Sequence, residues 1–202
     1  MAALDRLAAE RTDLTEHEVA WLHAVISDWA LVADLALSDL VLWLPTWNTA
    51  GYVAVAHVRP ATGATSVPDD LIGTFLAKGR SRCLDRASAS GQPHRVRAAS
   101  APLLPTEAEA TVVRKDGRVL GFIERRLAAT ARVVGRLEQV YLSSADDLLA
   151  MICAGTFPLA DTLSRGGTPP RVGDGGIRLN TEGRVEFASP NAQSAFRRLG
   201  LA

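Results

Sequence analysis

The chain has 202 residues, which is enough for one or two domains. Of these residues 48% are hydrophobic and 22% are charged, as in an ordinary soluble globular protein. The 22 basic residues balance the 22 acidic ones, so no overall charge draws the chain to nucleic acid or to an anionic membrane. The two cysteines, Cys83 and Cys153, follow no disulfide pattern, which favours a reducing compartment.

The sequence shows neither a targeting signal nor a membrane span. Residues 1–14 carry charges among small side chains and do not form a signal peptide. The most apolar stretch, residues 29–44, is interrupted by Asp34, Ser38 and Asp39, and is too short and too charged to cross a bilayer. We therefore expect a cytoplasmic protein with no membrane partner and no direct nucleic-acid partner.

The first strong element is a helix over residues 16–36. Thr15 and Glu18 have the spacing of a capping box, in which each side chain bonds the backbone of the other residue. Apolar residues recur along this stretch at steps of three and four, which predicts one buried face: Val19, Leu22, Ile26, Trp29 and Ala33.

Two strands follow this helix. Residues 39–44 are continuously apolar, which indicates a strand buried on both faces, and residues 52–58 form its partner after a turn. Glycines and prolines then divide residues 60–104 into short pieces, with one short helix expected near residues 81–89. An irregular stretch of this length is often functional when it lies inside a compact domain.

A hairpin and a second long helix complete the first part. Residues 109–114 and 118–124 flank an Asp-Gly pair, the strongest short signal for a hairpin. Apolar residues at helical spacing predict a helix over residues 130–153. Strands joined by hairpins, with long helices at both ends, predict an α+β fold in which an antiparallel sheet carries both helices on one face.

The C-terminal residues begin something that they do not finish. Residues 161–176 are rich in Gly, Pro, Ser and Thr and are typical of a linker, and residues 177–187 alternate as a hairpin. Residues 189–200 then read as a short helix that ends at a glycine. Because one hairpin and one helix cannot bury a core, we expect this chain to be part of a longer modular protein.

We find no set of residues that supports catalysis. No glycine-rich phosphate loop lies between a strand and a helix, and no serine lies in a nucleophile elbow. The histidines at positions 17, 23, 57 and 94 share no metal-ligand spacing with one another or with the cysteines. The sequence therefore indicates no metal and no cofactor, and we expect the chain itself not to be an enzyme.

Several single features leave two interpretations open. His57 ends an apolar strand and either is a satisfied core or rim residue or faces a pocket. Cys83 begins the short helix, where the helix dipole would lower its pKa and make it reactive, or else it is a small buried residue. The two long helices have near-heptad spacing, so they either pack only on their own sheet or also form a dimer seam.

The chain resembles the N-terminal sensory region of the PdtaS-type two-component sensor histidine kinases of actinobacteria. The resemblance runs from the first helix to the last residue and is strongest after Asp146. The matching segments are Leu22-His-Ala-Val25 with Trp29 and Ala33-Asp34-Leu35; Asp146–Leu149 with Gly155-Thr-Phe-Pro158; Pro170-Arg-Val-Gly-Asp-Gly175; Ile177-Arg-Leu179; and Ala188-Ser-Pro-Asn-Ala192.

The resemblance implies a domain order and a division of labour. Residues 1–155 would form a GAF domain, residues 156–171 a linker and residues 172–202 the beginning of a PAS domain. The kinase module that follows in this family would use ATP and transfer phosphate through a histidine to an antiterminator-type response regulator. The phosphoacceptor and ATP-binding boxes of the family have no counterpart in these residues, so no catalytic residue is carried over.

The resemblance also implies where a ligand would bind. GAF pockets usually lie between the sheet and the irregular segment on its face. By position, the residues near such a ligand would be Trp43, Tyr52, His57, Cys83 and Phe122.

Three functions remain open from the sequence. The first is a regulatory sensor that detects a small molecule or a redox signal and passes it to the kinase module. The second is a structural or dimerisation scaffold whose cavity is filled by side chains. The third is a thiol-dependent enzyme on a GAF-like fold, which would need Cys83 and Cys153 to meet.

Overall fold

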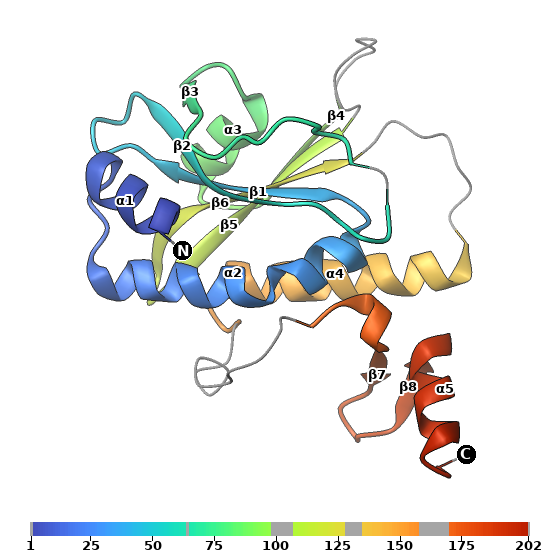
Figure 1. Ribbon diagram of the computed structural model, residues 1–202. Coiled ribbons are helices and arrows are strands. Elements are labelled where there is room, and N and C mark those ends of the chain that lie inside the picture. The colour runs from blue at the N-terminus through green and yellow to red at the C-terminus, as the bar shows by residue number, and fades with distance from the viewer. Residues whose placement is uncertain (1, 64, 98–106, 128–134, 158–169, 202) are drawn as a thin grey trace.

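A computed structural model describes residues 2–63, 65–97, 107–127, 135–157 and 170–201 (Figure 1). Its main sheet has six strands in the order β3-β2-β1-β6-β5-β4, and every neighbouring pair is antiparallel. The strands are β1 (Asp39–Pro45), β2 (Gly51–Val58), β3 (Phe75–Ala77), β4 (His94–Arg97), β5 (Glu107–Lys115) and β6 (Arg118–Leu127). The antiparallel sheet that the sequence predicts is therefore confirmed.

Strand β1 lies in the centre of the sheet, which explains why its sequence is continuously apolar. Alternate residues point to opposite faces of a strand. Leu40 and Leu42 belong to the core on the helix side, whereas Val41 and Trp43 belong to a second core on the other side. Both faces of β1 are therefore removed from water.

The hairpin between β5 and β6 turns at the Asp-Gly pair. Lys115 pairs with Arg118, so the turn contains only Asp116 and Gly117. Both turn residues have positive φ, 49° and 80°, as a type I′ turn requires. This turn matches the right-handed twist of the strands and sets the register of the longest strand pair in the sheet.

Helices α2 (Glu16–Ala36) and α4 (Arg136–Ala154) lie side by side across one face of the sheet (Figure 1). The capping box predicted at the start of α2 is present, with Thr15 and Glu18 bonded to each other's backbone. We expected α4 to begin at about residue 130, but it begins at Arg136, because Gly135 is extended at its N-cap. Residues 130–134 lie outside the described part of the chain.

Helix α1 (Ala2–Arg11) was missed by the sequence analysis, and it adds Leu4, Leu7 and Ala8 to the core under α2. By length and composition alone, α2 is apolar enough to cross a membrane. Half of its most apolar window is nevertheless buried inside the protein, as in the core helix of a globular domain.

The opposite face of the sheet carries α3 (Arg82–Ser90), which Ser81 caps through the Leu84 backbone N–H. A segment that we call the strap, residues 59–70 apart from residue 64, also crosses this side between β2 and β3 (Figure 1). The short helix was predicted, whereas β3 and β4 were not. These two strands have only three and four residues, too few to show an alternating pattern.

The C-terminal part lies below α2 and α4, away from the main sheet (Figure 1). It consists of a 3₁₀ turn, η2 (Val172–Asp174), the hairpin of β7 (Ile177–Leu179) and β8 (Val185–Ala188), and α5 (Pro190–Arg198). The predicted hairpin and helix are thus present. Large apolar side chains remain exposed on them, with Val185 at 61% and Leu199 at 72% of full exposure. The assignment of this part to a PAS domain, and the domain boundaries, stay predictions.

Candidate functional site

Four of the five predicted pocket residues form one closed core on the α3 side of the sheet. Trp43, Tyr52, Cys83 and Phe122 are 1–3% exposed and belong to one hydrophobic cluster. The rings of Tyr52 and Phe122 meet edge to face with their centroids 5.8 Å apart. Side chains from the sheet and α3 therefore occupy the position at which the resemblance places a ligand.

Buried hydrogen bonds hold this cluster in place. The Trp43 Nε1–H donates to Glu124 Oε2 at 2.9 Å, and the Tyr52 hydroxyl donates to Asp85 Oδ1 at 3.0 Å. Burial raises the pKa of Tyr52 to about 12, so its phenol stays protonated. Because both polar tips have partners within the protein, neither ring needs a ligand to satisfy it.

The surroundings of Cys83 favour the second of its two interpretations, a small buried residue, over a reactive thiol at a helix N-terminus. Its Sγ–H donates to the backbone oxygens of His94 and Ala108, and the residue is 3% exposed. Burial raises the pKa of the Cys83 thiol to about 12, against the effect of the helix N-terminus. Cys83 is a small buried residue, the alternative that the sequence left open. Cys83 and Cys153 are both free thiols.

His57 lies on the same face of the sheet near the end of β2, where it pairs with Val41. Its side chain is 1% exposed and lies between two carboxylates, with Nε2 4.0 Å from Asp39 Oδ1 and Nδ1 3.9 Å from Asp70 Oδ1. Neither ring nitrogen has a hydrogen-bond partner. Burial lowers the pKa of His57, and nearby Arg59 adds to this effect, while Asp39 and Asp70 oppose it.

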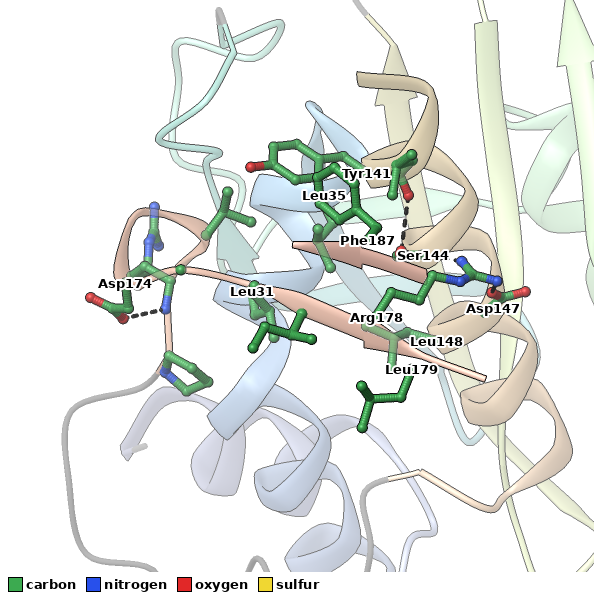
Figure 2. A pocket seen from close by; sticks show the side chains of 17 residues that line it. Leu31, Leu35, Tyr141, Ser144, Asp147, Leu148, Asp174, Arg178, Leu179 and Phe187 are labelled. Atoms are coloured by element: carbon green, nitrogen blue, oxygen red, sulfur yellow. Dashed lines mark hydrogen bonds and ion pairs between the residues drawn. The ribbon is translucent and has the colours of Figure 1, made fainter. Parts of the chain in front are cut away.

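A second site lies where the main domain meets the C-terminal part. We call it the junction cleft, a hollow of about 470 Å³ between α2, α4 and the β7–β8 hairpin (Figure 2). This volume falls within the range of small-molecule sites, which occur preferentially between domains. Its walls are mainly apolar and include Leu31, Leu35, Leu148, Ile177, Leu179 and Phe187.

Polar side chains converge on one wall of the junction cleft. Arg178 forms an ion pair with Asp147 at 2.8 Å and donates to Ser144 Oγ at 3.3 Å (Figure 2). It also forms an ion pair with Glu186 at 3.4 Å. Ser144 occupies the position on α4 where a large apolar residue would complete the helix face, and the smaller side chain gives Arg178 room to reach it. The sequence analysis did not single out Arg178.

The aromatic contact across the junction cleft joins Tyr141 of α4 to Phe187 of β8, whose rings meet edge to face at 6.2 Å. Burial raises the pKa of Tyr141. At the other end of the cleft, the linker residues Arg171 and Val172 bond to Asp34, a fully buried carboxylate of α2. The cleft is therefore lined by residues from both parts of the chain, and one of them, Arg171, forms an ion pair with Asp34.

The described residues contain no group of three His, Cys, Asp or Glu side chains placed to hold a metal ion. Sequence reasoning also missed Asp34 and Arg171 as functional candidates, because their importance depends on a contact between residues 137 positions apart. The one available signal was a carboxylate on the apolar face of a helix, where a buried charge needs a partner.

This arrangement is that of a GAF sensor domain followed by a further segment. The family model for the GAF domain of the histidine kinase PdtaS matches residues 4–145. The chain is 39% identical to the sensor histidine kinase PdtaS of Mycolicibacterium smegmatis and 38% identical to that of Mycobacterium tuberculosis, in each case over all of this chain and 41% of the relative. A solved structure, the sensor region of a sensor histidine kinase, superposes with a TM-score of 0.84 at 37% identity, covering this whole chain and 70% of that one.

The chain belongs to the PdtaS family of histidine kinases and contains its GAF domain. It spans about two fifths of the length of the curated relatives and corresponds to part of their sensor region. The family relationship and the GAF-like fold expected from the sequence are thereby confirmed.

Proposed function

We propose that this region detects a small molecule in the junction cleft and passes the signal to a downstream kinase module. One observation carries the proposal: the cleft is walled by α2 and α4 on one side and by the β7–β8 hairpin on the other. A ligand that fills it contacts both parts at once. Binding therefore favours one relative arrangement of the two parts over others, which is how a ligand shifts a conformational equilibrium.

The five residues of the predicted sheet-face pocket stay a second candidate site. A ligand there has to displace the packed rings of Tyr52 and Phe122, so it would select a minor, opened conformation. The same closed packing favours the scaffold function, in which the GAF domain only mediates assembly. The thiol-enzyme function is weakened, because the raised pKa of Cys83 keeps its sulfur protonated.

We infer the partners of the whole protein from its family. We propose an ATP-dependent histidine kinase module as the direct recipient of the signal, with an antiterminator-type response regulator beyond it. We also propose a cytoplasmic location and a homodimer joined along the long helices. The similarity to PdtaS supports the kinase module, and the half-buried side chains along α2 support the dimer.

Thermal unfolding with a panel of nucleotides, metabolites and divalent metals tests the sensor function, because a ligand that prefers the folded state raises the melting temperature. We expect at least one compound to give a saturable increase. Leu179→Ser, in the cleft wall, should abolish this increase. Leu199→Ser changes another exposed leucine of the same part, outside the cleft, and should leave the increase intact.

The variants also separate the alternatives. If Tyr52→Phe or His57→Gln abolishes the increase in melting temperature and Leu179→Ser does not, the ligand binds at the sheet face. A complete absence of stabilising compounds would favour the scaffold. Turnover of a sulfoxide that disappears in Cys83→Ser would favour the enzyme.

A further inference from the structure

Asp34 has an unusual position for a carboxylate. It lies near the C-terminal end of α2, its side chain is 1% exposed, and apolar residues of the same helix surround it in sequence. Removing a carboxylate from water costs free energy unless hydrogen bonds and an opposite charge compensate it. The groups that compensate Asp34 therefore show what this residue does.

Those groups come from two segments that are far apart in the chain. From the strap, the Ala61 backbone N–H donates to Asp34 Oδ1 at 2.6 Å, and the Thr62 hydroxyl donates to the Asp34 backbone oxygen at 2.5 Å. From the linker, Arg171 donates to the same Oδ1 at 2.9 Å, and the Val172 N–H donates to Oδ2 at 3.3 Å. One carboxylate thus joins the strap to the first residues of the C-terminal part.

The strap is held to the sheet by a second buried carboxylate, Asp39. Its oxygens accept from the Thr65 hydroxyl at 2.8 Å, from both the backbone N–H and the hydroxyl of Ser66, and from the Val67 N–H at 3.1 Å. Asp39 is also the carboxylate nearest to His57 Nε2. The strap therefore meets Asp34 at Ala61 and Thr62 and meets Asp39, which lies beside His57, at residues 65–67.

The linker end of this connection borders the junction cleft. Arg171 and Val172 line the cleft together with Leu31 and Leu35, which flank Asp34 on α2. If Arg171 leaves Asp34, the linker wall of the cleft loses its ion pair, and the carboxylate keeps only the bonds from the Ala61 and Val172 backbone N–H groups. Movement of either the strap or the linker away from Asp34 therefore changes the charge that the other segment faces at this carboxylate.

We propose that Asp34 is a positioning residue that couples the strap on the sheet face to the linker wall of the junction cleft. Loosening either segment weakens the hold of Asp34 on the other. This inference deepens the proposed sensor function, since it names the route between its two candidate sites. It concerns the chain by itself, however, and its test needs neither a ligand nor a kinase module.

Amide hydrogen exchange resolved by residue tests the coupling, because the structure supplies reporters on both sides. The N–H groups of Ala61 and Val172 bond directly to Asp34, and those of Ser66 and Val67 report on the far end of the strap. Arg171→Gln is the informative variant, since within the described residues Arg171 bonds to Asp34 and Asp174 and not to the strap, and its side chain is partly exposed. We expect exchange at Ala61 and at Ser66 to rise by at least about fivefold.

Two variants serve as matched controls. Arg178→Gln removes the other arginine that ties the C-terminal part to the helices, and it should leave exchange at Ala61 unchanged. Asp28→Asn removes the same charge from the same helix without removing a hydrogen bond or ion pair to the described residues of either segment, and it should change exchange on neither side. Asp34→Asn should raise exchange at Ala61 and Val172 together.

Unchanged exchange at Ala61 and Ser66 in Arg171→Gln would overturn the coupling. So would an equal rise at Ala61 in Arg178→Gln, because the strap would then respond to any loosening of the C-terminal part and not to Asp34. The exchange rates are measured on the chain without ligand. The test of the coupling is therefore independent of the ligand panel that tests the sensor function.

Discussion

At the scale of single residues, buried polar groups rather than apolar ones distinguish this domain. Asp34 and Asp39 are both fully buried, and each receives hydrogen bonds from the strap. His57 is buried beside Asp39 but has no hydrogen-bond partner for either ring nitrogen. A satisfied carboxylate stabilises the fold, whereas an unsatisfied histidine makes stability depend on its protonation.

The buried position of His57 predicts a specific dependence of stability on pH. Burial lowers its pKa in the folded state, so below about pH 6.5 the unfolded chain takes up the proton more readily than the folded one. The stabilising contribution of the neutral ring is therefore present above about pH 6.5 and is lost as the pH falls toward the folded-state pKa. Urea denaturation between pH 8 and pH 5 should show this fall.

His57→Gln gives the comparison, because glutamine does not titrate. The difference in free energy of unfolding between wild type and variant should be constant above about pH 7.5 and should shrink as the medium becomes acidic. A difference that stays constant down to pH 5, or grows, would show that His57 is not held neutral by its burial.

At the scale of elements, the helices, strands and turns that carry a local sequence signal are the ones that the sequence predicts correctly. The capping box at Thr15, the strands β1 and β2 and the Asp116-Gly117 turn all appear where the sequence placed them. Strands β3 and β4 carry no such signal and exist because β2 and β5 offer them an edge. The start of α4 was predicted too early, because the apolar spacing in the sequence continues before Gly135, whereas the helix begins after it.

The capping box makes a measurable contribution to α2. Thr15→Ala removes the hydroxyl that accepts from the Glu18 backbone N–H, leaving an unsatisfied donor in the first turn. We expect the free energy of unfolding to fall by about 1 kcal/mol. Thr74→Ala, at an exposed threonine in the same domain, should change it by less than about 0.5 kcal/mol. Equal effects in urea denaturation would mean that the cap contributes nothing special.

At the scale of the whole molecule, the GAF domain presents a closed sheet face and an open junction. The sequence predicted the α+β fold, the two flanking helices and the family, and it named the residues of the sheet face. It could not predict that Trp43 and Phe122 belong to one closed cluster, nor that Asp34 forms an ion pair with Arg171. Both facts depend on how distant elements are placed. The junction cleft could not be predicted from the sequence for the same reason.

We propose that this junction controls the output of the kinase. The decisive measurement is histidine autophosphorylation in a protein in which this region is joined to the PdtaS kinase module, with wild type, Asp34→Asn and Asp28→Asn compared. We predict that Asp34→Asn changes the rate at least about fivefold, as expected for an allosteric coupling of ordinary size, while Asp28→Asn keeps the wild-type rate. Equal rates in all three proteins would contradict the claim.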